Sequence, residues 1–183
     1  MLNKAKQIFE KDYYRNTNGK KFHFYSYFVM GKKMRMLFWF RKCNNSKGIF
    51  YFFNRIIYSH YLKWNNNEIP AKTSIGEGLY LGHSGGRYIN SNCIIGRNCN
   101  LNHNVTIGQE NRGIRKGSPT IGNQVWVGAN AVIVGNISIG NNVLIAPNSF
   151  VNFDVPSDSI VIGNPAKIIK DEFATKDYIC DIV

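Results

Sequence analysis

A six-residue repeat runs from about Ile69 to Val151 and constrains the fold more than any other feature of the chain. An aliphatic residue returns at every sixth position, and glycine usually follows it. The thirteen aliphatic positions of the repeat are Ile69, Ile75, Leu81, Ile89, Ile95, Leu101, Ile107, Ile121, Val127, Ile133, Ile139, Ile145 and Val151. A period of six fits neither an amphipathic helix nor an isolated two-faced strand. It predicts a parallel β-helix, in which each hexad supplies one short strand and one corner.

Smaller residues accompany the aliphatic ones, usually two positions earlier. They include Cys93, Cys99, Val105, Val125, Ala131, Val143 and Ser149. Stacked coils place like residues over like, so we expect the aliphatic side chains to fill a narrow interior and the smaller ones to fit the corners. Glycine and asparagine accept the turn conformations with positive φ that such corners need. One hexad cannot bury its apolar side alone, so the coils must stack into a continuous core.

The repeat is interrupted twice. Two extra residues lie between Leu81 and Ile89, and a longer insertion follows Ile107. The insertion predicts an exposed loop over residues 109–119. Loops that project from a rigid scaffold are where binding groups concentrate.

Two histidines lie beside these interruptions. His83 follows Leu81 by two residues, and His103 follows Leu101 by two residues. Three hexads, about one coil, separate the two, so their backbones should lie roughly 4.8 Å apart on adjacent coils. Paired imidazoles, which titrate near neutral pH, make this place a candidate site.

Basic and aromatic residues concentrate before the repeat. Residues 1–68 hold fourteen of the 23 Lys and Arg, only three of the eleven acids, and eighteen of the 25 aromatic residues. This segment is predicted to be helical. It either packs as a cap on the β-helix or contacts an anionic membrane surface through residues 1–60. Nucleic acid is not expected as a partner, because no zinc-finger spacing or RNA-binding motif is present.

Other features limit the possible cellular location of the protein and the state of its cysteines. No apolar run approaches the roughly 20 residues of a membrane-spanning helix, and the N-terminus lacks the pattern of a cleaved signal. We therefore expect a cytoplasmic protein, either free or peripheral at the inner membrane face. The four cysteines show no CxxC pair and no metal spacing, and Cys93 and Cys99 should be buried structural thiols.

Four motifs resemble a known family. They are Glu68-Ile69, the stretch from Ile75 to His83, the stretch from His103 to Gly108, and Gly163 to Lys167. Together they resemble the hexapeptide-repeat acyltransferases of the serine acetyltransferase branch, above all the short members associated with polysaccharide synthesis. The resemblance implies a left-handed β-helix, a homotrimer, and acetyl-CoA lying in the groove between neighbouring subunits.

The resemblance also implies roles for individual residues. His83 matches the catalytic histidine, Glu68 falls where an aspartate orients that histidine, and a backbone N–H near Gly108 would stabilise the oxyanion. His103, Ser118 and Arg87 are candidates for contact with the acceptor. The candidate coenzyme A contacts are Gly128, Ala129, Ala146, Pro147, Lys167 and Lys170. No metal is expected, because the zinc site of γ-type carbonic anhydrases on this scaffold needs three histidines and the repeat holds two.

The acceptor is the least constrained part of the prediction. Serine-specific enzymes carry a histidine where this chain has Ser118-Pro119, they typically carry glutamine at His103, and they have a longer helical N-terminal domain. These departures favour a sugar hydroxyl of a capsule or O-antigen precursor. The alternatives are L-serine, as in cysteine biosynthesis, and a trimeric platform without enzymatic activity.

These features predict three parts of the chain. A helical segment covers residues 1–67, and an acyltransferase β-helix covers residues 68–165 with the extruded loop at 109–119. A C-terminal tail follows at residues 166–183.

Overall fold

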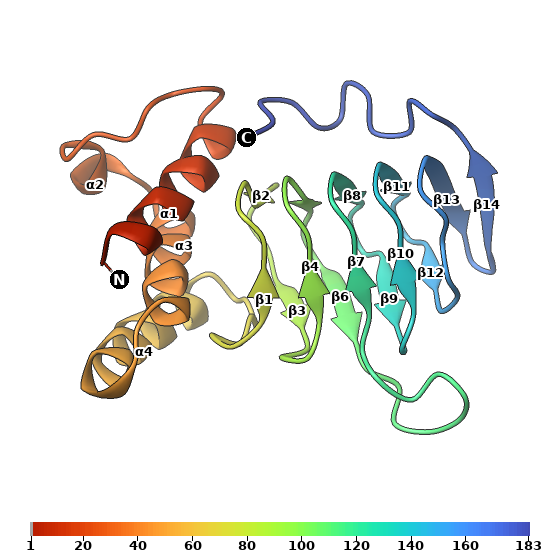
Figure 1. Cartoon of the computed structure of the whole chain (residues 1–183), viewed down its shortest axis with the longest axis horizontal. Coiled ribbons are helices and arrows are strands. Elements are labelled where there is room, and N and C mark those ends of the chain that lie inside the picture. The colour runs from red at the N-terminus through yellow and green to blue at the C-terminus, as the bar shows by residue number, and fades with distance from the viewer. Residues whose placement is uncertain (1) are drawn as a thin grey trace.

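The computed structural model describes residues 2–183 and places helices at one end of a parallel β-helix (Figure 1). The helices are α1 (Leu2–Asn16), α2 (Ser26–Val29), α3 (Lys32–Asn44) and α4 (Gly48–Trp64). The strands are β1 (Ser74–Ile75), β2 (Tyr80–Leu81), β3 (Arg87–Ile89), β4 (Ile94–Ile95), β5 (Asn100–Leu101), β6 (Val105–Gly108), β7 (Thr120–Ile121), β8 (Val125–Val127), β9 (Val132–Val134), β10 (Ser138–Ile139), β11 (Val143–Ile145), β12 (Phe150–Val151), β13 (Ser159–Gly163) and β14 (Ala166–Lys170). The predicted β-helix with a helical N-terminal segment is confirmed.

The strands form three sheets that wrap around one interior. Their orders are β1-β4-β7-β10, β2-β5-β8-β11-β13-β14 and β3-β6-β9-β12. Every pair is parallel except β13 with β14. The register places like over like, since Leu81 pairs with Leu101 and Leu101 with Val127. All thirteen aliphatic positions of the repeat are buried, with at most 9% of any of them exposed.

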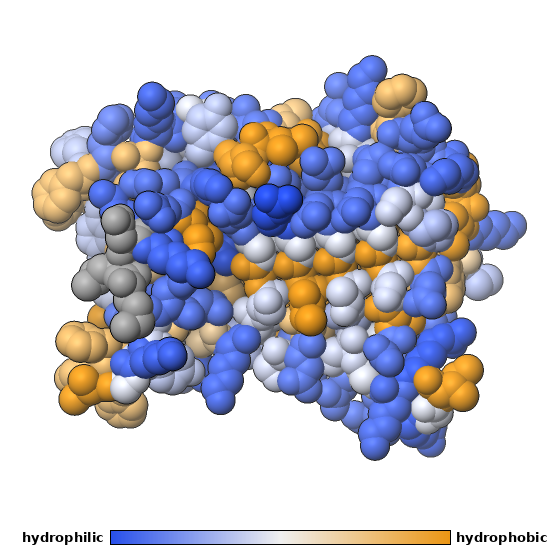
Figure 2. Space-filling model, viewed as in Figure 1, coloured by the Kyte–Doolittle hydropathy of each residue, from blue (hydrophilic) through white to orange (hydrophobic). Residues whose placement is uncertain are grey.

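The corners explain the small and amide residues of the repeat. Asn104, Asn130 and Asn148 adopt positive φ values of 56°, 59° and 61° at the same corner of three successive coils. A Cβ atom on Gly122 would lie 2.6 Å from the carbonyl oxygen of Gly140 in the next coil, so only glycine allows the coils to stack this closely. Figure 2 shows the result, a narrow apolar row along the stacked coils with a pale row beside it and hydrophilic surface beyond.

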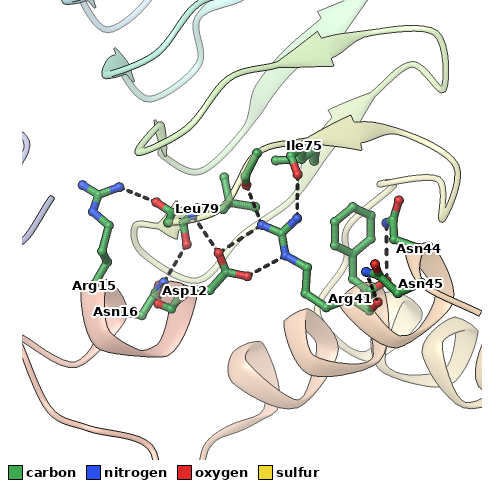
Figure 3. A network of polar contacts seen from close by, with 11 residues as sticks. Asp12, Arg15, Asn16, Arg41, Asn44, Asn45, Ile75 and Leu79 are labelled. Atoms are coloured by element: carbon green, nitrogen blue, oxygen red, sulfur yellow. Dashed lines mark hydrogen bonds and ion pairs between the residues drawn. The ribbon is translucent and has the colours of Figure 1, made fainter. Parts of the chain in front are cut away.

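Buried charges close the end of the β-helix that faces the helices (Figure 3). Asp12 of α1 and Arg41 of α3 form an ion pair of 2.6 Å between Oδ2 and Nε, and they are 0% and 2% exposed. Arg41 also donates to the carbonyl oxygens of Ile75 and Gly76, and Asp12 accepts the amide of Leu79. β1 and β2 are edge strands of their sheets, so these side chains satisfy backbone groups that a further coil would otherwise pair.

The helical segment therefore packs as a cap. Its apolar residues Phe9, Phe40 and Tyr58 belong to the same core cluster as the interior of the β-helix. The Tyr58 hydroxyl donates to the carbonyl oxygen of Ile69, 2.6 Å away.

Part of the cap leaves apolar side chains exposed. Phe24 before α2 is 83% exposed, and Phe50, Phe52 and Phe53 of α4 are between 58% and 72% exposed. Apolar clusters at the helical end are visible in Figure 2. Within residues 2–183, no helix has the length and the apolar character needed to cross a bilayer.

The C-terminal residues return along the β-helix toward the helices (Figure 1). After the antiparallel pair of β13 and β14, the ring of Tyr178 contacts that of Trp126 at a centroid distance of 5.0 Å. The Asn98 side chain exchanges two hydrogen bonds with the backbone of Val183, and Arg15 of α1 donates to the carbonyl oxygen of Cys180. The tail thus connects the last coil to the cap.

Candidate active site

The two histidines of the repeat lie side by side, as the hexad count predicts. β2 and β5 are paired neighbours, and each histidine follows its strand by two residues. The ring centroids of His83 and His103 are 5.7 Å apart and the ring planes meet at 76°. His83 is exposed and His103 half-buried. Nδ1 of His103 is buried and has no hydrogen-bond partner among the described residues.

The loop that carries His83 approaches the next coil very closely. Gly85 has a φ of 133°, and a Cβ atom there would lie 2.8 Å from the Cβ of His103. The amide of Asn104 donates to the carbonyl oxygen of Gly86 at 2.6 Å. The two extra residues after Leu81 therefore build a tight loop, and its glycines allow the histidines to meet.

Arg87 lies inside this loop and not on its surface. It is 1% exposed, and its guanidinium donates to three carbonyl oxygens: those of His83 at 2.7 Å, Gly85 at 2.9 Å and Leu101 at 3.1 Å. Burial lowers the pKa of Arg87 to about 10, so the group remains a cation at neutral pH. The contact between Arg87 and the acceptor that the sequence suggested does not fit this buried place.

Lys33 of α3 reaches the same loop from the helical cap. Its Nζ donates to the carbonyl oxygens of Leu81 at 2.6 Å and Gly82 at 3.0 Å. Burial lowers the pKa of Lys33 to about 8, and the positive charge of Arg87 adds to this fall. Sequence reasoning missed Lys33, because nothing in its neighbourhood distinguishes it from the other lysines of a basic segment.

A polar cavity of about 680 Å³ opens beside His83. Sheet residues form its floor, Lys33 and Arg15 come from the cap, and Asp177, Tyr178 and Asp181 come from the C-terminal tail. The tail residues were also missed, because no repeat or motif predicts how an irregular tail folds back. Both signs of charge thus meet at a cavity that contains a candidate general base.

Glu68 forms no hydrogen bond or ion pair with either histidine among the described residues. Its backbone forms a parallel bridge with Tyr88, and its amide donates to the carbonyl oxygen of Arg87 at 2.7 Å. Its side chain is exposed, and none of the hydrogen bonds or ion pairs between residues 2 and 183 joins its carboxylate to His83. The structure therefore does not bring together the predicted base and its predicted orienting carboxylate.

Ser118 and Gly108 lie at the base of the extruded loop. A bridge between Glu110 and Gly117 holds the loop, which projects away from the coils in Figure 1. The Ser118 hydroxyl lies 3.3 Å from the side-chain oxygen of Asn90 and is not among the residues that line the cavity at His83. Gly108 ends β6 and is half-buried. Within one chain, Ser118 lies apart from the paired histidines.

The later hexads stack closely where coenzyme contacts were expected. A Cβ atom on Gly128 would lie 2.5 Å from the backbone nitrogen of Pro147, so these two coils touch through their backbones. Ala129 is half-buried, and Ala146 is 9% exposed and packs near Ala174 of the tail.

The two basic candidates for phosphate contact are exposed on β14. The Lys167 side chain has no hydrogen bond or ion pair among the described residues, whereas the Lys170 amine donates to the carbonyl oxygen of Ser157 at 2.7 Å and lies 3.7 Å from the Asp158 carboxylate. Lys167 is therefore the freer of the two cations.

The buried cysteines are unreactive by environment. Burial raises the pKa of both Cys93 and Cys99 to about 11, so both thiols stay protonated at neutral pH. Within residues 2–183, no group of three His, Cys, Asp or Glu side chains is arranged to hold a metal ion.

Comparison with known proteins finds similarity to transferases. The family pattern described as "Bacterial transferase hexapeptide (six repeats)" matches residues 118–152. Serine acetyltransferase 2 of Arabidopsis thaliana is 41% identical over 103 residues, which are 56% of this chain and 32% of that protein. This chain therefore matches only about a third of that relative's length.

Two solved structures extend the similarity beyond the repeat. Neisseria gonorrhoeae serine acetyltransferase in complex with serine is 28% identical, with a TM-score of 0.68 over 91% of this chain and 69% of that chain. Brucella abortus serine acetyltransferase in complex with coenzyme A is 25% identical, with a TM-score of 0.73 over 93% of this chain and 68% of that chain. Matches of this extent include most of the helical cap as well as the β-helix.

Proposed function

We propose that this chain, which resembles the hexapeptide-repeat acyltransferases of the serine acetyltransferase branch in sequence and fold, transfers an acetyl group from acetyl-CoA to the hydroxyl of L-serine. The observation that carries the proposal is the pair of imidazoles, His83 and His103, at 5.7 Å beside a polar cavity on this scaffold. The solved relatives that resemble this chain include one in complex with serine and one in complex with coenzyme A.

The expectation of a sugar hydroxyl as acceptor is wrong. The curated relatives and the solved structures are named serine acetyltransferases, and none of them points to polysaccharide synthesis. That expectation gave weight to the short, basic N-terminal segment. However, structural matches covering 91% and 93% of this chain include most of its helices, so the helical cap does not distinguish the chain from serine acetyltransferases.

The proposed chemistry is direct acyl transfer. Neutral His83 removes the proton of the serine hydroxyl while that oxygen attacks the thioester carbonyl carbon. The resulting tetrahedral oxyanion collapses, the carbon–sulfur bond breaks, and the imidazolium returns the proton to the departing thiolate. The products are O-acetylserine and coenzyme A, and no covalent enzyme intermediate is required. The backbone N–H of Gly108 remains our candidate donor to the oxyanion.

The cavity at His83 offers both charges that an amino acid acceptor requires. Lys33 stands on the cap side and Asp177 and Asp181 stand on the tail side, whereas the guanidinium of Arg15 is buried and already bound to oxygens of Gly78, Asn100 and Cys180. A zwitterion presents a carboxylate and an ammonium group, which such a lining complements, whereas a neutral sugar presents neither. His103 lies beside the base and is our candidate for contact with the acceptor.

Assembly and cosubstrate binding complete the proposal. We place acetyl-CoA along the later hexads, near Gly128, Ala129, Ala146 and Pro147, in a groove between subunits of a homotrimer. Lys167 is the candidate phosphate contact because its side chain is exposed on β14. A cytoplasmic location suits a reaction that consumes acetyl-CoA, and contact of residues 1–60 with a membrane stays a prediction.

Acetyl-CoA consumption by the purified protein tests the function. We expect release of coenzyme A that depends on L-serine, and a fall of about 10²- to 10⁴-fold in turnover for His83→Ala. The matched control is His60→Ala, because His60 is an exposed histidine of α4 that is not among the residues lining the cavity. Serine-independent turnover, or an unaffected His83→Ala variant, would contradict the proposal.

A further inference from the structure

The backbone of the His83 loop is held by two cations that approach it from different elements. The loop leaves the repeat between β2 and β3, so its carbonyl groups lack the regular partners that stacked strands supply. Lys33 binds the carbonyl oxygens of Leu81 and Gly82, and Arg87 binds those of His83 and Gly85. Four carbonyl groups within five residues are therefore fixed by charged donors.

Neither Lys33 nor Arg87 forms an ion pair with a carboxylate of residues 2–183. The ion pairs formed between residues 2 and 183 involve other lysines and arginines, so Lys33 and Arg87 have only neutral oxygen partners. Two like charges so close to each other oppose folding unless their hydrogen bonds offset the cost. The consequence of this arrangement is a loop backbone whose carbonyl groups are held in fixed positions.

The two cations differ in where they come from. Arg87 begins β3 and extends back under its own loop, and it also binds the carbonyl oxygen of Leu101 beneath. Lys33 belongs to the first turn of α3, in the helical cap. It lines the cavity at His83 and also a second cavity of about 640 Å³ that includes Ser84, Gly85 and Arg87. The cap thus contacts the loop from the side of β2 on which the β-helix has no neighbouring strand among the described residues.

We infer that Lys33 and Arg87 are positioning residues that hold the His83 loop against the next coil, and that the helical cap acts on the reaction through Lys33. This inference rests on the proposed function for its kinetic consequence. A shift of about 1 Å in a catalytic group costs on the order of 10²-fold in rate, so a loosened loop lowers turnover while leaving remote substrate contacts intact.

The experiment compares Lys33→Met and Lys33→Arg with Lys32→Met. Lys32 is the matched control, because it neighbours Lys33 on α3 but its amine lies 4.0 Å from the ring centroid of Trp64. For Lys33→Met we expect turnover to fall about 10- to 100-fold, with KM for acetyl-CoA within about twofold of the wild type. Lys33→Arg should recover most of the turnover, and Lys32→Met should match the wild type.

Amide hydrogen exchange reports the loop without any substrate. Peptides covering residues 80–88 should exchange about tenfold faster in Lys33→Met, while peptides of β8 and β11 keep wild-type rates. Arg87→Lys should accelerate the same peptides, because one amine cannot reach all the carbonyl oxygens that the guanidinium binds. Unchanged exchange in Lys33→Met, or loss of turnover without rescue by Lys33→Arg, would overturn the inference. Inactivity of the wild type would instead defeat the proposed function, and the exchange result would still decide whether Lys33 holds the loop.

Discussion

The regular coils and the cap satisfy their backbone groups in different ways. From β4 to β12 each coil hydrogen-bonds the coils beside it, and its interior is filled by aliphatic and small residues. At the cap, Asp12 and Arg41 are buried as an ion pair whose remaining hydrogen bonds go to the first coil. A stacked repeat supplies its own partners everywhere except at its ends and interruptions.

The same contrast explains the candidate active site. The His83 loop is an interruption, and there too charged side chains replace the missing backbone partners. Arg41 at the end of the stack and Lys33 at the loop both extend from α3. One helix therefore both closes the β-helix and supports the candidate base.

The first prediction breaks the cap, where the largest effect is expected. Asp12→Ala leaves Arg41 buried without its carboxylate and removes the acceptor of the Leu79 amide. We expect the free energy of unfolding to fall by about 3–5 kcal/mol, measured by urea denaturation. Glu10→Ala on the same helix is the control, because its pair with Lys6 is exposed and should contribute less than about 0.5 kcal/mol. Equal losses for the two variants would show that the buried pair is not needed to close the stack.

The second prediction weakens the regular coils. Ile133 of β9 is fully buried between Ile107 and Val151 of the adjacent coils. Ile133→Ala should cost about 2–5 kcal/mol, and Ile133→Val about 0.5–1.5 kcal/mol, because the loss grows with the cavity left behind. Urea denaturation of the two variants measures both losses in the free energy of unfolding. A loss for Ile133→Ala no larger than that for Ile133→Val would mean that the interior collapses around the gap.

These two regions also differ in how much of them the sequence predicts. The hexad count predicts the buried rows and the pairing of Leu81 with Leu101, and from that pairing the meeting of His83 with His103. A stacked repeat makes distance along the chain a measure of position in space, so residues far from one another in sequence can be aligned by counting.

Counting fails where the repeat stops. Glu68 precedes the regular coils, and within residues 2–183 no hydrogen bond or ion pair joins its carboxylate to His83. Ser118 sits at the base of an insertion, and within the chain its hydroxyl meets Asn90. Lys33 and Asp177 reach the cavity from the cap and the tail through tertiary packing that no local pattern encodes. Arg87 follows the repeat, but its length lets it turn back beneath its own loop.

The third prediction concerns how folding stability depends on pH through Lys33 at the His83 loop. Burial lowers the folded-state pKa of Lys33 to about 8, below its usual 10.5. Between these pH values the unfolded chain binds more protons, so the stability of the wild type should rise with pH relative to Lys33→Met. We expect a difference on the order of 1 kcal/mol, because solvent screens a half-buried group. The titratable and charged groups that line the cavity with Lys33 are Arg15, Tyr80, His83, Asp177, Tyr178, Cys180 and Asp181, and Arg87 acts on it from the loop.

This difference is measured by urea denaturation of both proteins at about pH 7.5 and about pH 10, on either side of the Lys33 pKa of about 8. Lys33→Arg is the control, since a guanidinium stays charged across this range. A wild-type stability that falls relative to Lys33→Met as pH rises would reverse the sign and show that the charged amine stabilises the loop by more than its burial costs.

The smallest effect is expected on the outer face of α4. Phe52 is 62% exposed, whereas Phe40 of α3 is 2% exposed within the core. Phe40→Ala should lower the free energy of unfolding by about 3–5 kcal/mol. Phe52→Ala should change it by less than about 0.5 kcal/mol, because most of the Phe52 ring stays in contact with water in the folded state. Thermal and urea denaturation measure both. A loss above about 1 kcal/mol for Phe52→Ala that grows with protein concentration would mean that this face is buried between chains, since only association makes stability depend on concentration. The apolar residues of α4 would then serve assembly, just as those of the repeat serve the fold.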